Sequence, residues 1–372
     1  MGGLSVKVGI LTSSRADYGI YLPLLRAIQS DPFFEMHLLV FGSHLSEKFG
    51  YTASQIESDG FKISHRLCPS PENDAPGDIV KSMAKTMITF TELWERESFD
   101  LIIALGDRYE MFSAVSSTVP FNISVAHIHG GETTLGAIDN VFRHSLTSMS
   151  KLHFTSCEEY KSRVVEIKGS EKGVYNVGAL SYDTLAGMHF FTVEEFYEKY
   201  KIDLEKQTIL FTFHPETISY KKNEEFIQTL IELLGELKKY QIVITMPNAD
   251  TAGNIIRVNL KSFIKNRPNV FCIESFGSAG YLSCMKYCSF MLGNTSSGFV
   301  EASWFPKPVI NVGERQKGRI LTSNIISCGL VKKEIVEAIK RIEKIELKSI
   351  EKHYGDGNTS QRIKAIIKNL TL

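Results

Sequence analysis

The sequence lacks a surplus of charge of either sign. Its 372 residues include 42 Lys and Arg against 42 Asp and Glu. A chain without excess positive charge has little electrostatic attraction for a nucleic acid backbone or an acidic membrane surface. We therefore expect neither nucleic acid nor a membrane among its partners.

Long hydrophobic runs are also missing. No apolar segment of the sequence approaches the roughly 20 residues that a membrane-spanning helix needs. The N-terminus shows no basic segment followed by an apolar one, the pattern typical of a secretory signal. These absences predict a cytoplasmic protein.

Cysteine is scarce and scattered. The six cysteines form no Cys-x-x-Cys pair and have no zinc-ribbon spacing. Cys284 and Cys288 lie one helical turn apart, but such a lone pair is more typical of buried packing than of a metal site. We expect six reduced thiols.

What the sequence does have is a repeating order of secondary structure signals. Short apolar, β-branched runs alternate with Gly-containing loops and amphipathic helices, which predicts parallel sheets covered by helices on both faces. The first series of expected strands is Val6–Thr12, Met36–Phe41, Leu101–Leu105, Ile123–Ile128, Leu152–Thr155 and Tyr175–Val177. The second is Ile209–Phe213, Ile242–Met246, Val270–Ile273, Phe290–Leu292 and Val309–Val312.

Two series of this kind predict an α/β protein with two Rossmann-like parallel-sheet domains facing across a cleft. We place the first domain at residues 1–180 and the second at 181–358, and expect a C-terminal helix in 359–372 to pack back on the first domain. A long helix is expected over 79–97, and residues 68–77 are expected to form an irregular loop. The inward stripe of that helix is predicted to comprise Val80, Met83, Ala84, Met87 and Trp94.

The loop after the first strand is not the Gly-x-Gly-x-x-Gly of a dinucleotide site. It reads Thr-Ser-Ser-Arg-Ala-Asp-Tyr-Gly, from Thr12 to Gly19. Hydroxyls and Arg15 at a helix N-terminus suit an anionic ligand. Helix capping by the Ser and Asp residues explains the same letters equally well.

Two loops of the second half suit a nucleotide. Gly293–Gly298 reads Gly-Asn-Thr-Ser-Ser-Gly, whose small residues and hydroxyls suit a phosphate, and Glu301 one turn later suits a ribose. Taken alone, Glu301 is better explained as a solvated helix residue. Gly313–Arg319 resembles a phosphate loop only superficially, because Arg319 and Ile320 replace its Lys-Ser/Thr. Its three cations favour a diphosphate clamp over a solvated face.

Acid/base candidates gather at the ends of expected strands, where function is found in this fold class. They are Asp107, the segment from His127 through His129 to Glu132, Asp139 and, in the second half, His214. His127 and His129 share a strand face and could bind a metal. No third carboxylate has ligand spacing, so we predict no metal.

The order and spacing of these motifs, with Asn248 between them, resemble the hydrolysing UDP-N-acetylglucosamine 2-epimerases of bacterial sialic acid biosynthesis over almost the whole chain. The resemblance implies a glycosyltransferase-B-like fold. It also implies conversion of UDP-N-acetylglucosamine and water to UDP and N-acetylmannosamine, by elimination of UDP and hydration of the glycal. No cofactor is implied, and we expect a homodimer or homotetramer.

The same resemblance implies roles for individual residues. The residues implied in catalysis are Asp107, His129, Glu132, Asp139 and His214, the last as a contact to the leaving diphosphate. The residues implied in UDP binding are Arg15, Asn248, Thr295, Ser296, Ser297, Glu301 and Arg315. Many relatives have a catalytic Glu where this chain has His129, so proton transfer falls either to His129 or to the neighbouring carboxylates.

Three other functions fit parts of the pattern. A UDP-sugar glycosyltransferase would share the nucleotide residues but would not need the cluster of Asp107, His129 and Asp139. A hydrolysing epimerase of a UDP-2,4-diacetamido-2,4,6-trideoxy sugar, in the legionaminic acid pathway, would differ only around sugar carbons 4 and 6. A catalytically silent sensor would leave the ionisable cluster without a task.

Overall fold

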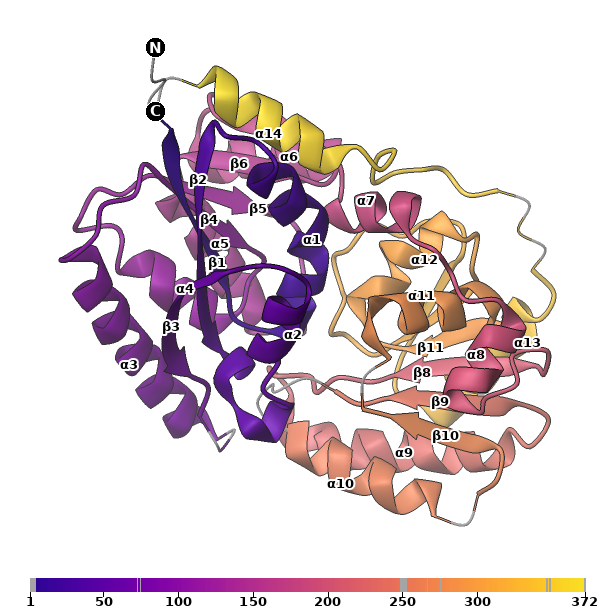
Figure 1. Ribbon diagram of the computed structural model, residues 1–372. Coiled ribbons are helices and arrows are strands. Elements are labelled where there is room, and N and C mark those ends of the chain that lie inside the picture. Colours follow the sequence, from indigo (N-terminus) through magenta and orange to yellow (C-terminus); the bar gives the residue numbers. More distant parts are fainter. Residues whose placement is uncertain are drawn as a thin grey trace. The chain divides into compact units, whose positions relative to one another are not determined.

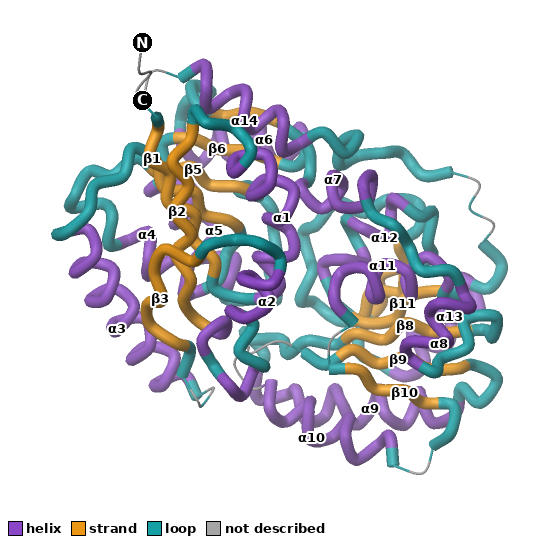
Figure 2. Tube along the Cα trace, in the orientation of Figure 1, coloured by secondary structure: helices purple, strands orange, loops and turns teal. Residues whose placement is uncertain are grey.

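The computed structural model describes residues 5–71, 73, 75–247, 253–265, 267–274, 276–345, 347 and 349–370. The chain divides into two compact units. Unit 1 comprises Met1–Glu132, Asp139–Ala186 and His353–Leu372, and unit 2 comprises Thr133–Ile138 and Gly187–Lys352. Each unit is built around one parallel sheet (Figures 1 and 2).

Unit 1 contains a seven-stranded parallel sheet in the order β3-β2-β1-β4-β5-β6-β7. The strands are β1 (Val6–Thr12), β2 (Phe34–Gly42), β3 (Ile63–Pro69), β4 (Leu101–Leu105), β5 (Val125–Ile128), β6 (Leu152–Thr155) and β7 (Val174–Asn176). Strands β4, β5 and β6 are buried along their whole length. This burial accounts for their nearly continuous apolar sequence, because helices cover both faces of such a sheet.

The helices of unit 1 form two apolar cores with the sheet, one that includes side chains of α1 and α14 and one that includes side chains of α3 and α4. They are α1 (Arg15–Gln29), α2 (Ala53–Ser58), α3 (Pro76–Trp94), α4 (Tyr109–Ser116), α5 (Asp139–Met149), α6 (Glu158–Lys168), α7 (Leu180–Gly187) and α14 (Thr359–Asn369), with short 3₁₀ turns η1 (Ser43–Leu45) and η2 (Glu47–Phe49). The C-terminal helix α14 lies beside α1 (Figure 1). Lys364 and Lys368 of α14 pair with Asp31, and the Asp183 carboxylate accepts hydrogen bonds from the first backbone N–H groups of α14.

Unit 2 contains a six-stranded parallel sheet in the order β10-β9-β8-β11-β12-β13. Its strands are β8 (Thr208–Thr212), β9 (Gln241–Thr245), β10 (Val270–Ile273), β11 (Phe290–Gly293), β12 (Val309–Val312) and β13 (Ile325–Cys328). Its helices are α8 (Val193–Tyr200), α9 (Asn223–Glu236), α10 (Gly253–Ile264), α11 (Gly277–Tyr287), α12 (Glu301–Trp304) and α13 (Lys332–Ile342), with 3₁₀ turns η3 (Tyr220–Lys222) and η4 (Ser296–Gly298). The prediction of two parallel-sheet α/β domains is confirmed.

The sequence reading missed β3 and β13, and both are edge strands. An edge strand is covered on fewer sides, so it need not have a continuous apolar run. Only two of the seven residues of β3 and one of the four residues of β13 are buried. Their positions at the edges of the sheets therefore allow these strands to contain polar residues.

The predicted inward stripe of the long helix is confirmed only at Trp94 and is wrong at Val80, Ala84 and Met87, which are exposed. Helix α3 buries Ile79, Ser82, Thr86, Phe90, Leu93 and Trp94. Val80 and Met87 are exposed, at 64% and 38% of their surface. Apolar periodicity identified the helix but not its buried face, because Ser82 and Thr86 pack inward where apolar residues were expected.

A short segment between two parts of unit 1 belongs to unit 2, which the sequence did not indicate. Residues 133–138, between the end of the β5 loop and the start of α5, pack within unit 2. Leu135 N donates to Lys317 O (2.9 Å), and Ile138 N donates to Thr217 Oγ1 (2.9 Å). A Cβ atom on Gly136 would lie 2.4 Å from Glu314 O, so only glycine fits there. No helix within the described ranges is long and apolar enough to cross a membrane.

Candidate active site

Asp107 lies directly after β4, in the turn that Gly106 forms with a left-handed φ of 82°. Its carboxylate forms an ion pair with the guanidinium of Arg143, from α5. The Asp107 side chain keeps 21% of its surface exposed, whereas Arg143 keeps only 4%. A buried cation thus fixes a carboxylate that remains partly accessible, which suits a group that exchanges a proton with a ligand.

His127, on β5, is fully buried and holds the same turn. Its Nε2 lies 2.7 Å from the carbonyl oxygen of Gly106, and its Nδ1 lies 3.2 Å from Thr147 Oγ1. Because a carbonyl only accepts, Nε2 carries the proton and Nδ1 accepts from the hydroxyl. Burial lowers the pKa of His127 to about 4. The ring is therefore neutral at physiological pH and connects β5 to the turn that carries Asp107.

His129 follows β5 directly and has an unusual backbone conformation, with φ at 64°. Its Nδ1 lies 3.3 Å from Glu132 Oε1, and Ser156 Oγ donates to the same carboxylate oxygen (3.3 Å). Glu132 is 3% exposed. A Cβ atom on Gly131 would lie 2.2 Å from Tyr160 O, so the tight turn between His129 and Glu132 requires glycine.

Asp139 begins α5, the helix that also contains Arg143 and His144. Burial is the largest cause that lowers the pKa of His144, and the nearby positive charge of Arg143 adds to it. The main chain of Glu132 hydrogen-bonds to the His144 ring. Helix α5 therefore contacts the β4 turn through Arg143 and the β5 loop through His144.

The geometry gives no support to a metal at His127 and His129. Both ring nitrogens of His127 are used by Gly106 and Thr147, as above. Among the described residues, the groups of three potential ligands with converging atoms lie elsewhere: His37 with His65 and Glu97, and Cys157 with Glu159 and His353. The absence of a metal at the acid/base cluster remains a prediction.

In the loop between β1 and α1, the polar side chains mostly hold the loop itself. Ser14 caps α1, and its side chain forms a reciprocal capping box with Asp17. The buried Asp17 carboxylate also accepts from Thr12 Oγ1 (2.6 Å) and from the hydroxyl of Ser13 (2.8 Å). Burial opposes ionisation, but these hydrogen bonds and the neighbouring His44 lower the pKa of Asp17 overall. Capping thus explains Ser14 and Asp17, and Arg15 stands in the first turn of α1.

In unit 2, His214 and Asn294 join the ends of β8 and β11. Asn294 Oδ1 accepts from His214 N (2.7 Å), and Asn294 Nδ2 donates to His214 O (2.8 Å). Both residues are buried. A Cβ atom on Gly293 would lie 1.9 Å from Thr212 O. Only glycine therefore allows the ends of the two strands to approach so closely. This contact fixes the backbone from which the Thr-Ser-Ser segment begins.

The segment after Asn294 presents hydroxyls. Thr295 caps η4, and its Oγ1 lies 3.1 Å from Ser297 Oγ. The hydroxyl of Tyr281, whose pKa is raised by burial, lies 2.5 Å from the same Ser297 Oγ. Ser296 is exposed, and Glu301 follows at the start of α12.

The cation-rich loop after β12 is held by buried polar residues. Glu216 Oε1 accepts from Glu314 N (2.6 Å), and burial raises the pKa of Glu216. Gln316 Nε2 donates to Asn294 O (2.9 Å), and Arg319 Nε donates to Gln316 Oε1 (2.6 Å). The three cations are therefore not equivalent: Arg319 is buried, Lys317 pairs with Glu314, and Arg315 lies 3.5 Å from Asn294 O.

The structure brings the first-half candidates together and shows which residues hold the candidates in place. In unit 1 these are His127, which the sequence had selected only as an acid/base or metal candidate, and Arg143. In unit 2 they are Glu216 and Gln316. The sequence analysis assigned none of these four residues a positioning role. Asn248 lies outside the described residues.

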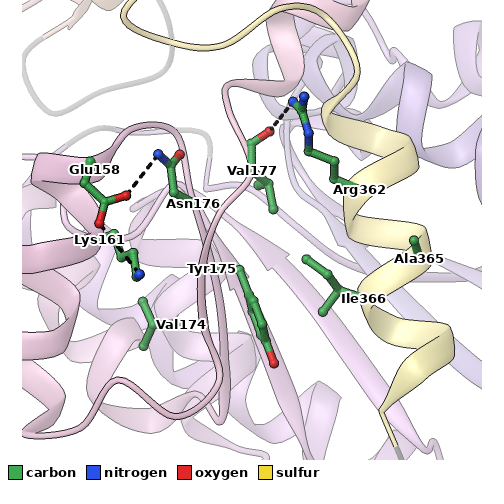
Figure 3. Close-up of a pocket in the computed structure, with 9 residues that line it drawn as sticks. All are labelled: Glu158, Lys161, Val174, Tyr175, Asn176, Val177, Arg362, Ala365 and Ile366. Carbon is green, nitrogen blue, oxygen red and sulfur yellow. Dashed lines mark hydrogen bonds and ion pairs between the residues drawn. The ribbon is translucent and has the colours of Figure 1, made fainter.

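One pocket of about 490 Å³ lies elsewhere in unit 1, among α6, β7 and α14 (Figure 3). It is lined by Glu158, Lys161, Val174, Tyr175, Asn176, Val177, Arg362, Ala365 and Ile366, none of which is a candidate residue. Its cations have partners already, since Lys161 pairs with Glu171 and Arg362 with Asp356. We therefore do not assign the reaction to this pocket.

A family model and several relatives agree on the family to which the chain is similar. The family model described as UDP-N-acetylglucosamine 2-epimerase matches residues 26–368. GDP/UDP-N,N'-diacetylbacillosamine 2-epimerase (hydrolyzing) of Campylobacter jejuni is 36% identical, over 92% of this chain and 88% of the relative. Polysialic acid biosynthesis protein P7 of Escherichia coli is 35% identical, over 90% of this chain and 85% of the relative. The UDP-N,N'-diacetylbacillosamine 2-epimerase (hydrolyzing) of Legionella pneumophila is 30% identical, over 98% of this chain and 96% of the relative.

Solved structures agree with the observed fold. UDP-GlcNAc 2-epimerase from Neisseria meningitidis bound to UDP-GlcNAc has a TM-score of 0.83 at 18% identity, over 98% of this chain and 100% of that chain. The UDP-GlcNAc 2-epimerase of Methanocaldococcus jannaschii in complex with UDP-GlcNAc and UDP has a TM-score of 0.80 at 17% identity, over 98% of this chain and 99% of that chain. The chain belongs to the UDP-N-acetylglucosamine 2-epimerase family, which includes hydrolysing UDP-sugar 2-epimerases.

Proposed function

We propose that this protein is a hydrolysing 2-epimerase of a UDP-2-acetamido sugar. It would convert the UDP-sugar and water to UDP and the free 2-epimer. The observation that carries the proposal is the group of ionisable side chains at the ends of β4 and β5, where Asp107 pairs with Arg143 and His129 lies beside Glu132. A glycosyltransferase would have no use for this group, because transfer to an acceptor needs no proton exchange at carbon 2.

The reaction needs proton transfers, which we assign to unit 1. Elimination of UDP removes the proton from carbon 2 and breaks the bond from carbon 1 to the diphosphate oxygen. Hydration then adds the water oxygen to carbon 1 and a proton to the opposite face of carbon 2. General acid/base groups held at defined positions serve both steps, and Asp107, His129, Glu132 and Asp139 are our candidates.

We assign the nucleotide mainly to residues of unit 2. The hydroxyls of Thr295, Ser296 and Ser297 and the guanidinium of Arg315 suit the diphosphate, because donors that are already positioned stabilise the charge that develops on a leaving group. Glu301 suits the two ribose hydroxyls. His214 at the end of β8, Arg15 at the start of α1 and Asn248 complete the proposed contacts to UDP.

The sugar itself has two candidates. UDP-N,N'-diacetylbacillosamine is supported by the relatives from Campylobacter jejuni and Legionella pneumophila, at 36% and 30% identity. UDP-N-acetylglucosamine, the substrate first indicated by the motifs, is supported by the enzyme of that name in Neisseria meningitidis, at 28% identity. The 36% identity to the Campylobacter jejuni relative favours the diacetamido sugar, whereas polysialic acid biosynthesis protein P7, at 35% identity, favours a role in sialic acid synthesis. The sugar that is turned over decides between sialic acid and legionaminic acid synthesis.

Incubation of the protein with each UDP-sugar in turn, without acceptor or metal, tests the proposal. We expect release of UDP and a free sugar inverted at carbon 2 from one of the two, identified by NMR. UDP release that requires an added acceptor would instead show a glycosyltransferase. Binding of UDP-sugar without turnover of either would show a sensor.

We further propose a cytoplasmic homodimer or homotetramer. Helix α3 supports an interface between copies, since it exposes Val80, Met87 and Ile88 in unit 1. Light scattering after size exclusion measures the subunit number directly. A monomer at micromolar concentration would contradict this part of the proposal.

A further inference from the structure

We propose that His129 and Glu132 act as a catalytic dyad, in which Glu132 fixes the tautomer of His129 so that Nε2 takes the proton from carbon 2 of the sugar. This inference rests on the proposed function and deepens it. It assigns His129 as the base and Glu132 as a positioning residue.

The carboxylate determines which nitrogen of His129 carries the proton. His129 Nδ1 lies 3.3 Å from Glu132 Oε1, and an ionised carboxylate only accepts hydrogen bonds. The proton of the neutral ring is therefore favoured on Nδ1, and the lone pair is left on Nε2. An imidazole in this tautomer, oriented by a carboxylate, is the form in which histidine acts as a general base.

The other nitrogen is kept available. Nε2 of His129 is buried and, within the part of the chain that the structure describes, has no hydrogen-bond partner. A buried polar atom left in this way costs free energy unless a ligand or water supplies the partner. The ring as a whole retains 11% of its side-chain surface, so it is not sealed inside the unit.

The backbone points to the same conclusion. His129 has a φ of 64°, a left-handed conformation that is unfavourable for a residue other than glycine. The flanking contacts impose it: His129 N donates to Phe154 O (2.9 Å), and the following turn must pass Tyr160 at Gly131. Such strain is concentrated at functional sites, where it holds a side chain in a direction that relaxed backbone would not give.

The charges around the dyad are compatible with a neutral base. His127, two residues before His129 in the chain, has a pKa lowered to about 4 by burial and is uncharged at neutral pH. The positive charge of Arg143 is paired with Asp107, and Glu132 accepts a hydrogen bond from Ser156 Oγ (3.3 Å). The carboxylate of Glu132, 3.3 Å from His129 Nδ1, favours the imidazolium that forms when Nε2 takes a proton.

In the elimination, Nε2 of His129 takes the carbon-2 proton, the C2–H electron pair becomes the C1=C2 double bond, and the electrons of the C1–O bond leave with UDP. An acid on the other face, for which Asp107 and Asp139 are candidates, then protonates carbon 2 as water adds to carbon 1. The proton lost by that water restores the acid, and the proton on Nε2 passes to solvent.

The test compares kcat/KM against pH in four proteins: wild type, Glu132→Gln, Ser156→Ala and the matched control Glu159→Gln. Glu159 also lies beside a histidine of unit 1, His353 (3.1 Å), but outside the candidate site. We expect Glu132→Gln to lower turnover at least tenfold and to move the acidic limb to lower pH, because the charge that favours the imidazolium is lost. Ser156→Ala should move the limb slightly the other way, because the carboxylate loses a donor. Glu159→Gln should change neither.

UDP affinity and thermal unfolding establish that each variant is folded, and Glu132→Asp, which keeps the charge, should recover part of the turnover. An unmoved acidic limb in both Glu132→Gln and Ser156→Ala would overturn the dyad. Near-normal turnover in His129→Gln would also overturn it, because the base itself would then lie elsewhere. Failure of the wild type to produce a 2-epimer from either UDP-sugar would instead overturn the proposed function.

Discussion

The candidate residues of the two units are held in place in different ways. In unit 1, charged or ionisable side chains contact one another directly, as Asp107 does with Arg143 and His129 does with Glu132. In unit 2, buried Asn294 and Glu216 hydrogen-bond to the main chain of the loops, and Ser296 is left exposed.

This difference fits the two tasks that we propose for the units. A group that transfers a proton needs a fixed protonation state and tautomer, which a charged or imidazole neighbour provides. A group that binds a nucleotide needs a rigid backbone that presents donors outward. Substitutions in one unit should therefore alter one task while leaving the other intact.

The largest effect is expected from Asp107→Asn. An amide keeps the shape but cannot accept a proton, so kcat should fall about a hundredfold or more while the affinity for UDP is unchanged. Assays of UDP release and calorimetry with UDP measure the two separately. The control Asp356→Asn removes an exposed carboxylate that also pairs with an arginine, Arg362, and should leave kcat unchanged. Equal losses of turnover and UDP affinity in Asp107→Asn would contradict the division of tasks.

The next effect is expected in unit 2. Arg315→Ala and Glu301→Ala should each weaken UDP binding by about 1.5–3 kcal/mol, or roughly ten- to a hundredfold, because each loses a charge-assisted contact. Lys317→Ala is the matched control, since Lys317 already pairs with Glu314 (2.5 Å). Its UDP affinity should stay within about twofold of wild type. Equal UDP affinity in all three variants and the wild type would place the nucleotide elsewhere.

A smaller effect concerns the stability of unit 1 against acid. The pKa of His127 is about 4 in the folded protein, below its ordinary value of about 6.5. The unfolded chain therefore binds more protons at this residue between these values, and the free energy of unfolding falls as the pH falls through that window. From pH 7 to pH 5 this one residue should account for about 2 kcal/mol.

Urea unfolding at the two pH values measures this loss, and His127→Gln should show a correspondingly smaller pH dependence. His189→Gln is the control, because His189 is 79% exposed. An equal pH dependence in His127→Gln and wild type would show that the buried ring is not the group responsible.

The smallest effect is expected from chelation. With both nitrogens of His127 used inside unit 1, prolonged treatment with EDTA should change turnover by less than about twofold. Loss of activity in EDTA with recovery in Zn²⁺ or Mn²⁺ would replace the acid/base assignment with a metal site.

Strands could be predicted from the sequence where their residues are buried. Central strands such as β4 and β8 are wholly buried, so their apolar letters revealed them. The edge strands β3 and β13 have mixed letters and were missed. The stripe of α3 was misplaced because Ser82 and Thr86 face the core, and apolar periodicity does not register buried polar residues.

Some residues of the candidate site could likewise be found from the sequence, and others could not. Asp107, His129 and Glu132 follow strands, so their position in the chain was enough to select them. Arg143 and Glu216 were not selected, because their contacts to Asp107 and Glu314 join residues 36 and 98 positions apart. Periodicity and local motifs carry no information on pairs so distant in sequence.

The central claim is that the protein eliminates UDP and hydrates a glycal. It is tested most directly by running the reaction in heavy water with the UDP-sugar that is turned over, and by following the released sugar by NMR. We predict deuterium at carbon 2 of the 2-epimer, because hydration places a solvent hydrogen there. A released sugar with its original hydrogen at carbon 2 would contradict the claim and indicate direct hydrolysis or transfer.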